Sequence, residues 1–374
     1  MRKCLISILF SFLFILSARA THDTFEYDFG FWKKFEIKSS DQYYQFKSDL
    51  IDDENVKKEI KNTKKTGLIS YLLFEDDKII IDEKDLPVYI RHNNGYLTSN
   101  SIGKSLVSYV AGHAICEGYI KSVDVILDDW SVLDNTLYKG QRFIDLLNMS
   151  AGDQNYIGQY KNRTDSLIPG TNFNVNVFPI EDILAMNMFQ SSKKSSKKYN
   201  YNALVTNIIM NYVIFKSGDN FENLLHKVFN EKVKVKDNVY FHRSVRNFNT
   251  INTSSGWYQF HATRYDYLRI AKAIMDDWNN DTCVGKYLKT IYERRINKGH
   301  TKKNPRYFGG LTKKYGGQFH FDIYGLEKRK ILGMGGLGGQ NILIDVDKKR
   351  IFVLHSVDRH YNWSKIVYKK LKQK

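Results

Sequence analysis

A serine and a lysine three positions apart, Ser101 and Lys104, are the residues whose types and spacing point to chemistry. On a helix, residues three apart share one face, so the amine can lie beside the hydroxyl. A serine hydroxyl becomes a strong nucleophile only when a base takes its proton. A lysine acts as that base only in its neutral form, which burial or nearby positive charge favours. The pair therefore predicts nucleophilic catalysis at Ser101, with Lys104 as the base.

The same spacing occurs twice more, at Ser191–Lys194 and at Ser195–Lys198. Both pairs lie in the segment Gln-Ser-Ser-Lys-Lys-Ser-Ser-Lys-Lys, whose composition is typical of a solvated charged stretch. The spacing at Ser101 also fits a serine that caps a helix and a lysine that is exposed to solvent. The elements around each pair must therefore distinguish these hypotheses.

The residues around Ser101 predict the start of a helix. Polar residues from Thr98 onward lead into an apolar run that extends to Cys116, as at a helix N-terminus. We expect the helix to reach about Glu117 and to end at Gly118, because glycine commonly terminates helices. The positive end of the helix dipole would then lie beside Ser101.

Three later stretches follow the serine–lysine pair in order. A short amphipathic helix is predicted within 141–152, where the sequence reads Leu-Leu-Asn-Met-Ser-Ala-Gly. A second helix is predicted to begin at about Tyr201, and Gly336-Leu337-Gly338 lies on a glycine-rich strand near the end of the chain. Together these features resemble the serine β-lactamase superfamily, in its class C β-lactamase-like branch, which includes the 6-aminohexanoate-dimer hydrolases.

The resemblance implies a role for each matching residue. Ser101 would be the nucleophile, and Lys104 and Tyr201 would act as general base and acid. Tyr160, in the sequence Tyr-Lys-Asn, is a second candidate for the tyrosine, and we favour Tyr201 because it is expected to open a helix. The third position of the motif that begins at Tyr201 is Ala203, which departs from the Tyr-x-Asn pattern of the superfamily.

The glycine-rich strand would supply the oxyanion hole and part of the substrate-binding surface. The resemblance implies that backbone amides of Ser101 and of the Gly336, Leu337 and Gly338 region face the developing oxyanion. Relatives carry a lysine or histidine in this motif, whereas this chain carries Leu337. We therefore expect the amide donors to remain and a cation for a substrate carboxylate to be missing.

The expected fold is α+β, an α/β sandwich of the β-lactamase/transpeptidase-like type. An antiparallel sheet would combine a hairpin at about 67–82 with strands between about 309 and 357, flanked by helices and accompanied by an all-helical lobe. We divide the chain into a signal peptide at 1–20, an N-terminal extension at 21–66 and a serine hydrolase domain at 67–374. The helical insertion would occupy about 124–250.

The first twenty residues have the pattern of an export signal. Arg2 and Lys3 precede an apolar stretch, and Ser17-Ala18-Arg19-Ala20 matches a cleavage site. We expect a periplasmic or secreted protein with no transmembrane segment after cleavage, and an uncleaved anchor is the alternative.

Cys116 is interpreted as a small core residue. A disulfide between Cys116 and Cys283 is possible in an oxidising compartment, but the sequence does not decide whether it forms.

The formal net charge of +17 points to acidic partners. An anionic envelope surface is a candidate partner, and an effect on solubility explains the charge equally well. The dispersed lysines and the export signal argue against nucleic acid. Cysteine and histidine residues show no metal-ligand spacing, so we predict no metal and no organic cofactor.

These observations predict an exported serine hydrolase. It would cleave an amide or ester bond of a small-molecule or peptide-like substrate through an acyl-enzyme on Ser101. The alternative is a catalytically weak envelope-associated or ligand-binding protein that retains the fold, which Ala203 and Leu337 favour.

Overall fold

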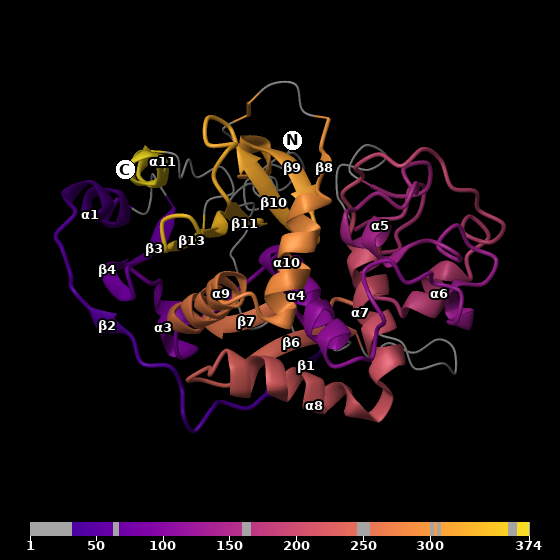
Figure 1. Cartoon of the computed structure of the whole chain (residues 1–374), viewed down its shortest axis with the longest axis horizontal. Coiled ribbons are helices and arrows are strands. Elements are labelled where there is room, and N and C mark those ends of the chain that lie inside the picture. The colour runs from indigo at the N-terminus through magenta and orange to yellow at the C-terminus, as the bar shows by residue number, and fades with distance from the viewer. Residues whose placement is uncertain are drawn as a thin grey trace, which may run out of the picture.

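The larger of the two sheets in the described part of the computed structural model extends from the left to the top of the view in Figure 1. The structure describes residues 32–62, 67–158, 166–244, 255–299, 303–304, 308–357 and 365–373. Within them the strands of this sheet are β2 (Lys47–Ser48), β3 (Leu68–Glu75), β4 (Lys78–Lys84), β8 (Ile296–Asn297), β9 (Thr312–Gly316), β10 (Phe319–Ile323), β11 (Ile331–Gly336), β12 (Gln340–Asp345) and β13 (Arg350–Ser356). Their order is β2-β4-β3-β13-β12-β11-β10-β9-β8, and the pairs are antiparallel except β2–β4.

Helices cover both faces of this sheet, which explains why its central strands are apolar on both sides. Every residue of β3 from Leu68 to Phe74 is buried, as expected for a strand covered on both faces. One face packs against α4 (Ile102–Cys116) and α9 (Arg264–Asn279), and α10 (Cys283–Glu293) lies beside them. The other face packs against α1 (Glu54–Lys61) and α11 (Val367–Lys372) (Figure 1).

A smaller antiparallel sheet has the order β1-β6-β7-β5. Its strands are β1 (Trp32–Ile37), β5 (Tyr96–Thr98), β6 (Val239–Ser244) and β7 (Phe260–Thr263). Thr98 on β5 pairs with His261 on β7, and α4 follows β5 after only three residues. This sheet therefore fixes the position at which α4 begins.

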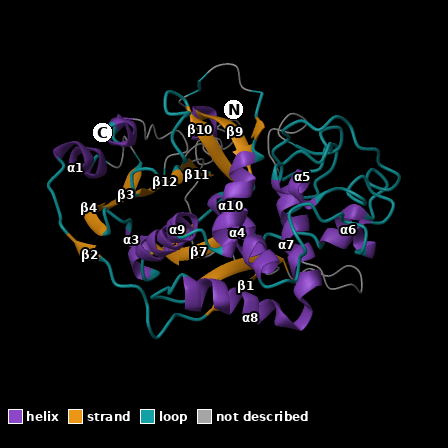
Figure 2. Cartoon of the chain, in the orientation of Figure 1, coloured by secondary structure: helices purple, strands orange, loops and turns teal. Residues whose placement is uncertain are grey.

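A lobe of helices and long loops lies at one end of the molecule (Figure 2). It contains α5 (Phe143–Leu147), α6 (Ile180–Leu184) and α7 (Ala203–Ser217), whereas α8 (Phe221–His226) and the π-helical stretch that follows it, Lys227–Lys232, lie along the smaller sheet. The interval 124–250, which we expected to be all-helical, also contains strand β6. A further short helix, α3 (Val88–His92), precedes β5.

The architecture is α+β, as predicted, and the hairpin at 67–82 corresponds to β3 and β4. The N-terminal extension is more integrated than we expected. Its described part supplies β1 to the smaller sheet, β2 to the larger sheet and α1 to one face. The predicted signal at 1–20 and residues 21–31 lie outside the described residues.

A disulfide joins Cys116, at the end of α4, to Cys283, at the start of α10. The sequence left this pairing open, and the interpretation of Cys116 as merely a small core residue is wrong. The Cα atoms lie 5.8 Å apart, within the usual range for a disulfide. The bond links α4 to its neighbour α10 across 167 residues of sequence.

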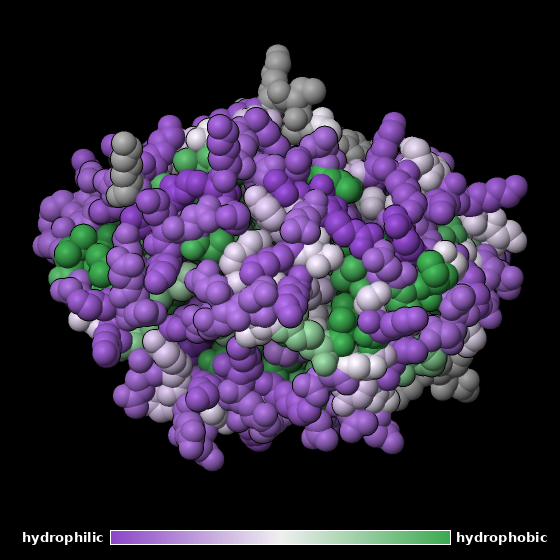
Figure 3. Space-filling view, in the orientation of Figure 1, coloured by the Kyte–Doolittle hydropathy of each residue, from purple (hydrophilic) through white to green (hydrophobic). Residues whose placement is uncertain are grey.

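The surface is mainly hydrophilic on the face shown in Figure 3, where apolar side chains form separate patches. Among the described residues, no helix combines the length and apolar character needed to cross a membrane.

Candidate active site

Ser101 lies at the junction between β5 and α4, as the N-cap of the helix. Its side chain makes no capping hydrogen bond, so the hydroxyl is not used as the capping hypothesis requires. The preceding residue, Asn100, has a φ of 44°, in the left-handed region that asparagine tolerates better than most residues. This sharp turn presents a partly exposed Ser101 at the end of an otherwise buried helix.

Lys104 is buried beside Ser101. Its Nζ donates a hydrogen bond to Ser101 Oγ at 3.0 Å, and the side chain is 1% exposed. The same Nζ lies 3.9 Å from the ring centroid of Tyr258 and 4.8 Å from that of Tyr201. The structure thus brings together all three residues that the resemblance places at the catalytic centre.

Tyr258 is a site residue that the sequence did not indicate. The glycine between Ser101 and Lys104 explains how it reaches the lysine, because a Cβ on Gly103 would lie 1.7 Å from the Tyr258 carbonyl oxygen. Gly103 therefore allows the backbone of Tyr258 to pack directly on the first turn of α4. The Tyr258 hydroxyl accepts a hydrogen bond from Asn176, which leaves the ring face toward Lys104.

Tyr201 precedes α7 rather than opening it. The helix begins at Ala203, with Asn202 as its N-cap, two residues later than predicted. Buried Asp153 accepts hydrogen bonds from the side chains of both neighbours, Asn200 at 2.7 Å and Asn202 at 3.1 Å. Burial raises the pKa of Asp153.

Asp153 thus holds the backbone on each side of Tyr201, and sequence reasoning missed it. Asp153 directly follows Gly152 of the Leu-Leu-x-Met-x-x-Gly stretch. This position beside the motif is the signal in the sequence that could have identified Asp153. Two aromatic rings also pack beside Tyr201. The Tyr201 ring centroid lies 6.4 Å from the ring centroid of Tyr199 and 6.1 Å from that of Tyr315.

The alternative candidates differ in their surroundings. Tyr160 lies outside the described residues. Ser191 and Ser195 belong to a segment without regular secondary structure, not to a helix start. Ser195 Oγ donates to the Gly152 carbonyl oxygen at 2.9 Å and not to a lysine partner. Among the three matches to the spacing, Ser101 is the one that contacts its lysine.

The glycine-rich strand β11 ends at Gly336, close to Ser101, so Leu337 and Gly338 lie in the turn after the strand and not on the strand as predicted. A Cβ on Gly336 would lie 2.4 Å from the Ser99 carbonyl oxygen, so a glycine permits this close approach. Asn100 Nδ2 donates to the Leu337 carbonyl oxygen at 2.6 Å. The turn that contains Leu337, Gly338 and Gly339 joins β11 to β12 at this point. The turn is therefore held against the two residues that precede Ser101.

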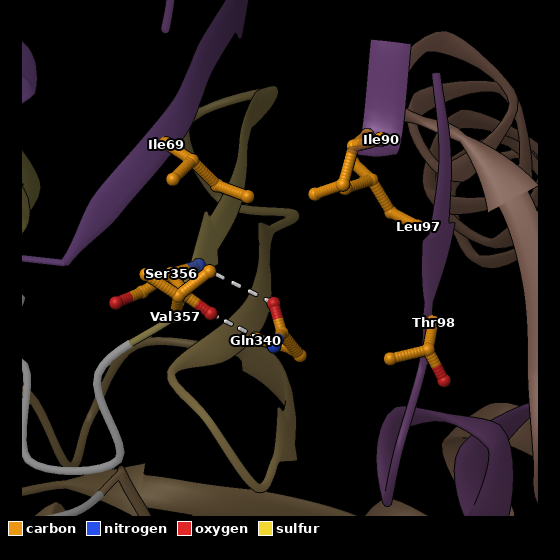
Figure 4. A pocket seen from close by; sticks show the side chains of 7 residues that line it. All are labelled: Ile69, Ile90, Leu97, Thr98, Gln340, Ser356 and Val357. Atoms are coloured by element: carbon orange, nitrogen blue, oxygen red, sulfur yellow. Dashed lines mark hydrogen bonds between the residues drawn. The ribbon is translucent and has the colours of Figure 1, made fainter. Parts of the chain in front are cut away.

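Leu337 is 54% exposed at this turn. The Gln340 side chain connects the turn to the end of β13. Its Nε2 donates to the Ser356 carbonyl oxygen at 3.0 Å and lies 3.4 Å from the Leu337 carbonyl oxygen. The Gln340 side chain also lines a small pocket between β5 and the ends of β12 and β13 (Figure 4).

In the described part of the chain, no cluster of three or more His, Cys, Asp or Glu side chains is arranged to hold a metal ion.

No protein-family model matches the sequence. No curated protein matches it either.

Solved structures show a clear likeness in fold. One is a proposed 6-aminohexanoate-dimer hydrolase from Bacillus anthracis, with a TM-score of 0.63 and 14% identity over 91% of this chain and 89% of that chain. Another is a proposed β-lactamase from Bacteroides dorei DSM 17855, with a TM-score of 0.62 and 13% identity over 86% of this chain and 98% of that chain. A class C β-lactamase mutant gives a TM-score of 0.56 and 11% identity, with coverage of 86% and 98%. The chain therefore has the fold of the serine β-lactamase superfamily, as the motifs predicted.

Proposed function

We propose that this protein is an exported serine hydrolase that cleaves an amide or ester bond through an acyl-enzyme on Ser101. The observation that carries the proposal is the 3.0 Å hydrogen bond between buried Lys104 Nζ and Ser101 Oγ at the start of α4. The direct contact of nucleophile and base is the signature of an activated serine.

The reaction would proceed in two halves. Ser101 Oγ attacks the substrate carbonyl carbon while the neutral Lys104 amine takes the hydroxyl proton. Amides of Ser101 and of the Leu337–Gly339 turn stabilise the oxyanion that forms on the carbonyl oxygen. The proton then passes to the leaving amine or alcohol, with Tyr201 beside Lys104, and the ester to Ser101 remains. In the second half the same groups take a proton from water while the water oxygen attacks the acyl carbon. The bond to Ser101 Oγ then breaks, the proton passes to Oγ, and the acid is released.

Two features support export to the periplasm or the exterior. The N-terminal residues have the pattern of a secretory signal. The disulfide between Cys116 and Cys283 is of a kind that persists in oxidising compartments.

A labelling experiment tests the proposed nucleophile. Wild-type protein is treated with a fluorescent fluorophosphonate and a fluorescent penicillin, and the labelled peptide is identified by mass spectrometry. We expect at least the fluorophosphonate to label wild type at Ser101 and to leave Ser101→Ala unlabelled. Ser191→Ala, which removes the serine of a second match to the motif, is the control and should label like wild type. Absence of labelling by both probes would contradict the proposal and favour a ligand-binding protein that retains the fold.

A further inference from the structure

A lysine-rich segment leads directly into the candidate active site and takes no part in the chemistry proposed above. We call residues 191–198, Ser-Ser-Lys-Lys-Ser-Ser-Lys-Lys, the lysine strap. Tyr199 follows it at once, and Tyr201, whose ring lies 4.8 Å from Lys104 Nζ, comes two residues later. The strap therefore ends at the wall of the site.

The strap is fixed to the protein through its backbone and its serines. Ser195 donates to the Gly152 carbonyl oxygen from both its N–H and its hydroxyl, each at 2.9 Å. The backbone N–H of Leu137 donates to Ser192 Oγ at 2.9 Å.

Gly152 is a glycine because the strap lies directly on it. A Cβ there would meet both the Lys194 side chain and the Ser195 carbonyl oxygen at 2.6 Å. The glycine of the Leu-Leu-x-Met-x-x-Gly stretch thus provides the surface on which the strap packs.

The lysines of the strap are more exposed than two of its serines. Lys193, Lys194, Lys197 and Lys198 are all exposed, whereas Ser192 and Ser195 are half-buried. Lys197 pairs with Asp145. Within the described residues the other three lysines have no acidic partner, in contrast to Lys139 and Lys216, which are paired in the same lobe.

The three uncompensated lysines are spread over positions 193 to 198, which suits a ligand with several charges along its length better than a single small ion. A chain covers at most about 3.5 Å per residue, so the positions from Lys193 to Tyr201 can extend well beyond the length of a single carboxylate or phosphate. An ammonium group binds either anion as a point charge. Because the strap is already ordered, binding does not have to supply the free energy of ordering the backbone.

We propose that the lysine strap binds a flexible polyanionic chain, with repeated carboxylate or phosphate groups, and guides it into the site at Ser101. The proposal rests on the proposed function for the identity of the site, but the binding itself does not require catalysis. The strap would then provide, outside the catalytic centre, the anion recognition that Leu337 cannot provide inside it.

Binding is measured with the Ser101→Ala protein, so that the outcome is independent of the acyl-enzyme. The probes are fluorescein-labelled poly-L-glutamate and polyphosphate, followed by anisotropy at low and high salt. The strap variant is Lys193→Gln/Lys194→Gln/Lys198→Gln. The control is Lys328→Gln/Lys348→Gln/Lys349→Gln, which removes the same charge from exposed turns that join strands at the other end of the sheet from Gly336.

We expect the strap variant to weaken polyanion binding roughly tenfold and to flatten its salt dependence, whereas the control should change it far less. The two probes distinguish a carboxylate from a phosphate polymer. An equal loss in both variants would show that net charge alone is responsible and would overturn the proposal. Binding to phosphatidylglycerol vesicles without binding to either polymer would also overturn it.

A competition experiment connects the strap to the site. Poly-L-glutamate or polyphosphate, whichever binds, should slow fluorophosphonate labelling of Ser101 in the wild type and should slow it much less in the strap variant. Polymer binding that leaves labelling unchanged would overturn the guiding role. Failure of the probe to label Ser101 at all would instead contradict the proposed function and leave the binding result standing.

Discussion

Two regions of this protein bury a lysine beside a hydroxyl, and they differ in what surrounds the hydroxyl. At the start of α4, Lys104 Nζ lies 3.0 Å from Ser101 Oγ. At the edge of the large sheet, Lys298 Nζ lies 2.7 Å from Thr312 Oγ1, and the two lysines are 1% and 3% exposed. Thr312 is fully buried, whereas Ser101 is partly exposed.

The remaining contacts separate the two pairs further. Lys298 also donates to the Gly309 carbonyl oxygen and lies 3.4 Å from His320 Nδ1, while Thr312 Oγ1 donates to the same carbonyl at 3.1 Å. These bonds tie one edge of the sheet together, and burial lowers the pKa of Lys298 to about 7. The two lysine–hydroxyl pairs therefore differ in the accessibility of the hydroxyl, which is the property that the proposed nucleophile requires.

The largest expected difference is between the two hydroxyls. Ser101→Ala should lower hydrolysis of a neutral ester such as p-nitrophenyl butyrate by on the order of 10⁴-fold or more, with little change in thermal stability because the side chain caps nothing. Thr312→Val should retain activity near that of wild type. A large loss of activity in Thr312→Val would remove the distinction between the two regions.

The two lysines should differ next. Lys104→Met should reduce kcat/KM for the same ester by ~10²–10⁴-fold, since it removes the general base while roughly keeping the volume. Lys298→Met should keep kcat/KM close to the wild-type value. Steady-state kinetics on both variants checks this, and comparable losses would show that Lys298 acts on the site.

The glycine turn should have a smaller but specific effect. Gly336→Ala places a methyl group against the Ser99 carbonyl oxygen, so the turn must move away from Ser101, and a displacement of about 1 Å costs ~10²-fold in kcat. Gly335→Ala is the matched control because its Cβ would meet the Phe308 ring, a side chain, at 2.6 Å. We expect the control to lower the unfolding temperature and to leave kcat close to the wild-type value. Equal kcat losses would contradict a specific role for Gly336.

The smallest expected effect is a change in how stability depends on pH. A lysine in the unfolded chain has a pKa of ~10.4, and burial lowers the pKa of Lys298 in the folded protein to about 7. Between these values the unfolded chain binds more protons than the native protein, so this group makes stability rise with pH. The destabilisation is fully present below the folded pKa and is lost as pH rises toward the unfolded value.

Urea unfolding of wild type and Lys298→Met at pH 6.5 and at pH 9.5 measures this effect. The variant should gain most relative to wild type at the lower pH, and the gain should shrink at the higher pH. Lys349→Met, at an exposed turn, should show no such pattern. A gain that is constant with pH would show that Lys298 is not the titrating group.

Local pattern in the sequence was enough to predict the elements that carry the site. The apolar run after Ser101 indicated α4, and the apolar segments on either side of Glu75-Asp76-Asp77 indicated the hairpin of β3 and β4. The glycine-rich strand was predicted in the right place, but only Gly336 belongs to β11, and Leu337 and Gly338 lie in the turn that follows it. Such patterns work because the burial of one face and the presence of glycine are properties of short segments. The order of these segments along the chain then indicated the fold that the solved structures share.

The tertiary structure alone decided which residues surround Ser101 and Lys104. Tyr258 reaches Lys104 from 154 positions away in the sequence, and the bond between Asn100 and Leu337 spans 237 residues. Periodicity says which face of an element is buried, but it does not say which distant residue packs against that face. The pairing of Cys116 with Cys283, the bonds from Asp153 to both neighbours of Tyr201 and the difference between Lys104 and Lys298 therefore follow from the packing of the folded chain.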